Sequence, residues 1–198
     1  MAFSSATGRV TRSSSCPWWS KSEACWIASI NRSSAFAIEL NRLLERAIVK
    51  SRCVDVEELC VRSGERCWTL RVEATALNNE GNLSDTLCLA AIGALMHFRR
   101  PDVTVDGTEV TVHDSEEKEP VKLTLHHKPF TVTMGYTAEQ KEGEDKKIII
   151  LDPSRQEEVV LSGALSVAIN KHREVRLKYT YNSFCKIFYS DLCLTFIR

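Results

Sequence analysis

The chain has 198 residues, of which 43% are hydrophobic and 26% are charged, and this balance is typical of a globular domain with its own core. Its 26 basic residues equal its 26 acidic residues, so no overall field draws the chain onto nucleic acid or an anionic membrane. The C-terminal stretch 179–198 is rich in aromatic residues, but Lys186 and Asp191 interrupt it. We therefore expect no membrane insertion, and any contact with RNA must be local.

The eight cysteines are scattered, with no C-x-x-C pair and no histidine at a zinc-like spacing. We expect reduced thiols that behave as small apolar residues in an intracellular protein, with no metal and no other cofactor. One alternative is a Cys–His nucleophile formed by Cys60 or Cys67 with His97. A core thiol and a histidine at a helix end explain the same residues without any chemistry.

The first half of the chain predicts an irregular segment followed by a helix. Residues 1–34 are serine-rich with little periodicity, which favours irregular structure. From Ala35 to Arg52, apolar residues recur at intervals of three and four, which predicts an amphipathic helix with Arg42 and Arg46 on its wet side.

A strand, turn and buried helix come next. Val56–Arg62 and Cys67–Leu77 predict a strand hairpin, and an Asn- and Gly-rich turn at 78–82 leads into an apolar helix that ends near Phe98. A turn that feeds a helix N-terminus can hold an anion with its free N–H groups. A phosphate-using enzyme would add a cation there, and this turn contains no Arg or Lys.

The remaining pattern alternates short strands with charged loops and ends in a helix. The expected strands are 103–105, 109–113, 122–126, 130–136 and 147–151, and the helix runs from Gln156 to Lys171 with inner positions such as Val159 and Leu161. This order predicts an α+β fold, a mixed sheet with two or three helices packed on one face.

Five segments in consistent order resemble the RNase PH-type family: LNRLLER, LNNEGNLSD, AAIGALMHFRRPDV, LDPSRQEE and AINKHRE. They are similar to the non-catalytic RNase PH-like ring subunits of the eukaryotic RNA exosome. The resemblance covers residues 35–175 and leaves 1–34 and 176–198 unmatched. It implies an incomplete RNase PH-like (ribosomal protein S5 domain 2-like) fold whose first half is missing, as in a truncated or alternatively spliced form or a mis-joined gene model.

The resemblance also implies a degenerate catalytic site. In active members, an acidic residue and glycine precede a Ser or Thr and then an Arg that holds the phosphate. Here Leu83 stands at the hydroxyl position and Ser84 at the Arg position, which removes a bidentate clamp. Two carboxylates of active members fall on Glu158 and Ala164, and Glu158 is also explained as a first-turn residue favoured by its helix dipole. We therefore expect no catalysis.

By resemblance, the chain is a structural subunit of the exosome core ring that supports 3′-to-5′ RNA processing and degradation, including rRNA maturation and mRNA decay. Its expected partners are other RNase PH-like ring subunits, RNA-binding cap subunits and RNA in the assembled channel, and its expected locations are the nucleus, nucleolus and cytoplasm. The alternatives are a phosphorolytic 3′-to-5′ exoribonuclease and a truncated isoform that does not assemble. Candidate RNA contacts are Arg42, Arg46, Arg99 and Arg100, which a solvated helix face and a helix C-terminus also explain.

Overall fold

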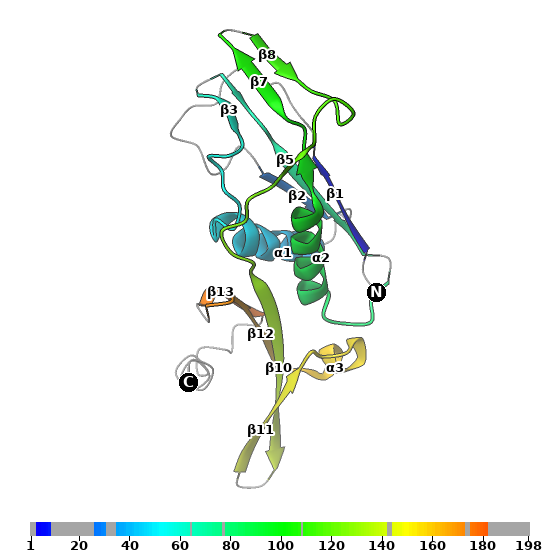
Figure 1. Ribbon diagram of the computed structural model, residues 1–198. Helices are drawn as coiled ribbons and strands as arrows, with labels where there is room; N and C mark the ends of the chain where they lie inside the picture. Colours follow the sequence, from blue (N-terminus) through cyan, green and yellow to red (C-terminus); the bar gives the residue numbers. More distant parts are fainter. Residues whose placement is uncertain are drawn as a thin grey trace.

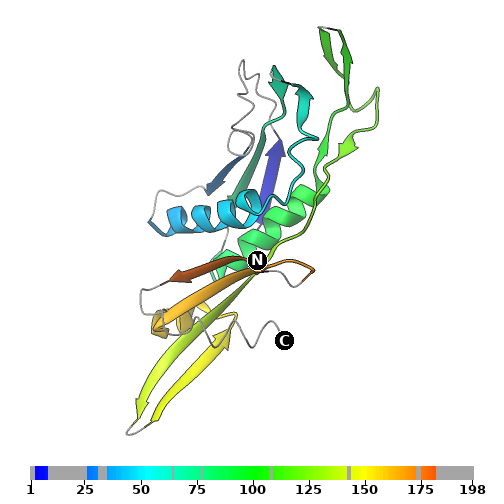
Figure 2. The same ribbon diagram turned by 90° about the vertical axis from the view of Figure 1, so that its left-hand side faces the viewer.

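The computed structural model describes residues 3–8, 26–30, 35–63, 65–76, 78–107, 109–141, 144–172 and 175–181. Within these residues the strands form a three-stranded sheet, a four-stranded sheet and three two-stranded pairs. Helix α2 lies between the two larger sheets and contacts α1, β1, β5 and β10 (Figures 1 and 2). The predicted α+β class is confirmed, with the helix packed between sheets.

The bounds of the elements, in chain order, are β1 Phe3–Gly8, β2 Trp26–Ile30, α1 Ala35–Leu44, η1 Glu45–Lys50, β3 Cys60–Arg62, β4 Arg66–Cys67, β5 Leu70–Thr75, α2 Leu83–His97, β6 Arg99–Arg100, β7 Val103–Asp106, β8 Glu109–Val112, β9 Val121–Lys122, β10 Phe130–Lys141, β11 Glu144–Leu151, α3 Arg155–Val160, β12 Gly163–Ile169 and β13 Val175–Tyr181. Element η1 is a π-helical continuation of α1. No helix in the described parts of the chain is long and apolar enough to cross a bilayer.

Two strands flank β5, and both come from the N-terminal segment. Strand β1 pairs with β5 antiparallel and β2 pairs with it parallel. The prediction that residues 1–34 are irregular is therefore wrong at these strands, and the rest of that segment lies outside the described residues. The reason is that β5 has hydrogen-bonding groups on both edges, which partners distant in sequence satisfy, and local periodicity carries no sign of such pairing.

The four-stranded sheet has the order β11-β10-β12-β13. Its last strand, β13, pairs antiparallel with β12 and begins where the family resemblance was expected to end. Of the expected C-terminal segment 176–198, residues 182–198 lie outside the described residues.

The predicted helix 156–171 is the largest error in secondary structure. Helix α3 is short, and Gly163–Ile169 form a central strand instead, paired with β10 and β13. A short apolar run fits a buried strand as well as a helix face, so its periodicity does not separate the two. Val159, expected to point inward, is 84% exposed.

Smaller differences concern strand lengths. The predicted strand 56–62 forms only at its end, as β3, and the stretch 122–126 contributes only β9 and a single bridge between Val54 and Leu125. The predicted charged loop at 139–147 is instead, in its described part, the far end of the β10–β11 hairpin, which projects from the molecule (Figure 2).

The core gathers around one face of α2. Leu87, Ala91 and Leu95 are at most 1% exposed and belong to one hydrophobic cluster with residues of α1, η1 and β5. On the opposite face Leu89 and Met96 are 57% and 46% exposed. The prediction of a buried apolar helix is thus confirmed for one face, which positions the N-terminus of α2 for the site described next.

Candidate functional site

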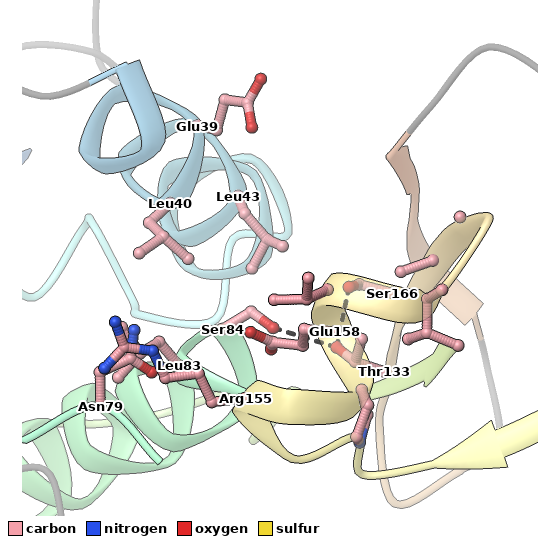
Figure 3. Close-up of a pocket in the computed structure, with 15 residues that line it drawn as sticks. Glu39, Leu40, Leu43, Asn79, Leu83, Ser84, Thr133, Arg155, Glu158 and Ser166 are labelled. Carbon is pink, nitrogen blue, oxygen red and sulfur yellow. Dashed lines mark hydrogen bonds between the residues drawn. The ribbon is translucent and has the colours of Figure 1, made fainter. Parts of the chain in front are cut away.

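A cavity of about 350 Å³ opens between α1, the N-terminus of α2, α3 and the sheet strands β10 and β12 (Figure 3). Leucines of α1 form an apolar wall, and hydroxyl and carboxylate groups form the opposite side. The residues that line it are Glu39, Leu40, Leu43, Asn79, Leu83, Ser84, Thr133, Pro153, Arg155, Glu158, Val159, Leu161, Gly163, Ala164 and Ser166.

All four degenerate positions of the sequence analysis line this cavity. Leu83 and Ser84 are the first residues of α2, Glu158 comes from α3, and Ala164 comes from β12. The fold therefore brings together two halves of a site that are far apart in the sequence. The chemical role assigned to each position stays a prediction.

The turn before α2 is held tightly against the segment that leads into α3. Gly81 has φ +112°, and a Cβ placed on it would lie 2.5 Å from the backbone N of Arg155. The same backbone N–H of Arg155 donates a hydrogen bond of 2.9 Å to the carbonyl oxygen of Glu80. Only glycine combines this conformation with this close approach, so the residue fixes the two helix N-termini side by side.

Asn82, at the start of α2, is surrounded by carboxylates. Its backbone N–H donates to Glu158 Oε1 at 2.8 Å, while its Nδ2 donates to Asp85 Oδ2 at 2.8 Å and to Asp152 Oδ1 at 2.6 Å. The side chain is 6% exposed and the backbone is left-handed, at φ 45°. The partial positive charge of the α2 N-terminus is therefore already met by the chain's own anions.

This arrangement decides what the cavity can bind. An incoming phosphate would compete with Glu158 for the Asn82 N–H and would meet like charges, each worth about 1 kcal/mol of repulsion at 4 Å even in water. The prediction that Glu158 is only a favourable first-turn residue is incomplete. That description fits its neighbour Glu157, whose carboxylate accepts hydrogen bonds of 2.8 Å from the N–H and Oγ of Ser154 and so has a lowered pKa.

Three hydroxyl groups linked by hydrogen bonds form the polar side of the cavity. Thr133 donates from its N–H and Oγ1 to the Asp85 carboxylate at 2.7 and 2.8 Å. The same Oγ1 lies 3.0 Å from Ser84 Oγ and 2.8 Å from Ser166 Oγ (Figure 3). Ser84 is thus hydrogen-bonded within the protein. That Asp85, Thr133 and Ser166 come together was not predicted, because Thr133 lies 48 and 33 residues from the other two and no local pattern indicates such pairing.

One cation does reach the cavity. Arg155 is exposed and lies beside Asn79 and Leu83 (Figure 3). The turn at 78–82 itself contains no cation, whereas the fold supplies this one from α3. The available signal was its place immediately after the Pro153–Ser154 turn that ends a strand.

The candidate RNA contacts separate into two kinds. Arg42 and Arg46 are exposed on α1 and η1. By contrast, Arg99 donates to the carbonyl oxygens of Met96, His97 and Phe98 at 3.0–3.2 Å, and Arg100 forms an ion pair with Glu58 at 3.5 Å. Both arginines therefore have a structural role at the end of α2, and RNA contact stays a prediction for all four.

The alternative nucleophile residues lie on separate elements, with Cys60 and Cys67 on β3 and β4 and His97 at the end of α2. Among the described residues no group of three histidine, cysteine, aspartate or glutamate side chains could hold a metal ion.

Residues 3–101 match the model of the 3′ exoribonuclease family, domain 1 (the RNase PH family). The chain belongs to this family. The match begins at residue 3, within the segment that the sequence resemblance left unmatched.

Among curated proteins, the chain is 46% identical over 144 residues to the exosome complex component RRP45 of Bos taurus, covering 73% of this chain and 31% of that protein. It is 42% identical over 138 residues to exosome complex component rrp45 of Schizosaccharomyces pombe, covering 70% and 45%. The chain thus spans about a third to less than half of the length of these relatives.

Solved structures agree on the fold. An archaeal exosome core matches with a TM-score of 0.67 at 24% identity, covering 90% of this chain and 65% of that one. A structure described as the Archaeoglobus fulgidus exosome with RNA bound to the active site matches with a TM-score of 0.64, also at 24% identity, covering 90% and 68%.

Proposed function

We propose that the chain acts as a non-catalytic subunit of the RNA exosome core ring and supports 3′-to-5′ RNA processing and degradation. Its sequence identity of 42–46% to relatives named exosome complex component RRP45 supports this role. Within the ring, its position is that of the subunit called exosome component nine, which the HFRRPDV and NKHRE segments resemble.

The proposal that the chain is non-catalytic rests on the hydrogen bond of 2.8 Å from the Asn82 N–H to Glu158 Oε1. A phosphorolytic site needs an anion held at the α2 N-terminus by N–H groups and a cation, so that phosphate can attack. Here a carboxylate of the protein uses that position, Ser84 is bonded to Thr133, and Ala164 offers no acid. The residues around the cavity then serve to hold α1, α2 and α3 together.

The proposed partners are neighbouring RNase PH-like ring subunits, RNA-binding cap subunits and RNA passing through the assembled channel. The proposed locations are the nucleus, nucleolus and cytoplasm. Of the four candidate arginines, Arg42 and Arg46 are the two with exposed side chains, which leaves them available for RNA phosphates.

Assembly is tested by purifying the tagged full chain from cells of its source and identifying its partners by mass spectrometry. We expect the other ring subunits to be recovered in stoichiometric amounts. Recovery of the chain alone would contradict the ring role and favour the truncated isoform that does not assemble.

The alternative, a phosphorolytic 3′-to-5′ exoribonuclease, is favoured by one observation, the Arg155 cation in the cavity. We expect the purified chain with RNA and phosphate to release no nucleoside diphosphates. Phosphate-dependent release that is abolished by Arg155→Ala, but retained in the control Lys128→Ala at an exposed position outside the cavity, would establish the enzyme instead.

A further inference from the structure

The β3–β4 hairpin places two cysteines opposite each other. Cys60 and Cys67 are Cα partners in this antiparallel pair, whose register shifts between Cys60 and Arg62, and both are free thiols. The cavity described above does not include them, and neither does the proposed ring role.

The hydrogen bonding next to this pair shows how close its backbones lie. The N–H of Trp68 donates to the carbonyl oxygen of Leu59 at 2.8 Å. In an antiparallel ladder, a bond between the residue after one partner and the residue before the other marks a non-hydrogen-bonded pair, with Cα atoms about 4.5 Å apart. A disulfide requires a Cα separation of about 4.4–6.8 Å, so this register suits one.

The alternation of side chains puts both thiols on the same outer face. Leu59 and Trp68 are 0% and 5% exposed and belong to the core cluster. Because neighbouring residues of a strand point to opposite faces, Cys60 and Cys67 share the face turned away from the core. Cys60 is exposed and Cys67 is half-buried, whereas Cys53 and Cys88 are fully buried.

We propose that Cys60 and Cys67 form a dithiol site that exchanges with low-molecular-weight disulfides and closes reversibly into a cross-strand disulfide. The Cys60 thiolate attacks one sulfur of the small disulfide, a mixed disulfide forms and one small thiolate leaves. The Cys67 thiolate then attacks the Cys60 sulfur, the Cys60–Cys67 bond forms and the second small thiolate leaves. Two electrons pass from the protein to the small disulfide, and the two protons of the protein thiols end on the two released thiols.

Closing this bond ties together two short strands whose neighbours, Leu59 and Trp68, anchor the hairpin in the core. The reduced and oxidised chains therefore differ in how firmly the hairpin is held. This property is independent of ring assembly and of RNA.

The test uses the full chain equilibrated with mixtures of reduced and oxidised glutathione, followed by acid quenching, trypsin digestion and mass spectrometry without reduction. Cleavage after Arg52, Arg62, Arg66 and Arg71 gives one peptide with Cys53 and Cys60 and another with Cys67. We expect these peptides to be joined with the loss of two hydrogen atoms, and fragment ions to place the bond on Cys60.

Variants separate this pair from the other thiols. Cys60→Ser and Cys67→Ser each lose the joined peptides, while Cys88→Ala retains them. The oxidised glutathione needed for half-closure should be at least about tenfold lower for the folded chain than for the same chain in concentrated urea, because the register holds the thiols together. Equal values in the two conditions, a lasting glutathione adduct on Cys60, or a bond from Cys60 to any other cysteine would overturn the proposal.

Discussion

The junction of α2 with β10 depends on one carboxylate, and Asp85→Ala tests it. Asp85 accepts hydrogen bonds of 2.7, 2.8 and 2.8 Å from Thr133 N, Thr133 Oγ1 and Asn82 Nδ2. Alanine removes all three acceptor contacts and leaves Thr133, which is 6% exposed, with a buried N–H that has lost this partner.

The expected magnitude follows from these contacts. A hydrogen bond to a charged group contributes about 1.5–3 kcal/mol, and the three do not add in full because Asp85 is half-buried and Thr133 Oγ1 keeps Ser166 as a partner. We expect a loss of about 3 kcal/mol in the free energy of unfolding. For a urea m-value of about 2 kcal/mol per M, the midpoint falls by about 1.5 M.

Urea unfolding followed by circular dichroism measures this shift. Asp85→Asn keeps the volume but replaces one acceptor by a donor, so it should fall between wild type and Asp85→Ala. Glu109→Ala, at an exposed position of β8, serves as the control and should change stability by no more than about 0.5 kcal/mol. If Asp85→Ala matches this control, the α2–β10 contact does not contribute to the fold as described.

Two further predictions concern burial. Leu95→Asp should lower the free energy of unfolding by at least about 3 kcal/mol, because a side chain that is 1% exposed becomes an unpaired buried charge. Leu89→Asp, on the exposed face of the same helix, should change it by no more than about 0.5 kcal/mol. Equal unfolding midpoints for the two variants would contradict the orientation of α2. Burial raises the pKa of the Cys53 thiol to about 12, whereas Cys60 is exposed. Iodoacetamide at neutral pH should therefore label Cys60 and spare Cys53. Peptide mass spectrometry of the labelled chain shows which of the two thiols is modified first.

Local chemistry made several elements predictable. The Asn- and Gly-rich turn at 78–82 and the apolar run after it predicted α2, which spans Leu83–His97, and the strands expected at 103–105 and 109–113 form the β7–β8 hairpin. These signals lie within a few residues of the structure that they specify, so no partner is needed to interpret them. The positions expected to form the site from the resemblance, including Ser84 and Glu158, also line one cavity.

What could not be predicted depends on pairing across the chain. Strands β1 and β2 exist because β5 offers them two edges, and β12 is a strand because β10 and β13 lie on either side of it. The Asp85–Thr133 contact and the cation of Arg155 reach the site in the same way. Sequence periodicity describes one element at a time and contains no information about which other element will cover it.

The hydrogen bonds of Asn82 also order events in time. Its partners Asp152 and Glu158 lie 70 and 76 residues further along the chain. At about 5–20 residues per second of synthesis, the N-terminus of α2 precedes the Glu158 carboxylate by about 4–15 s. During that interval the N–H of Asn82 lacks its Glu158 partner, which arrives only when α3 has been synthesised and has packed against α2. The contacts that close the cavity are of high contact order, so we expect them to form after the folding transition state and substitutions at Glu158 to act mainly on the unfolding rate.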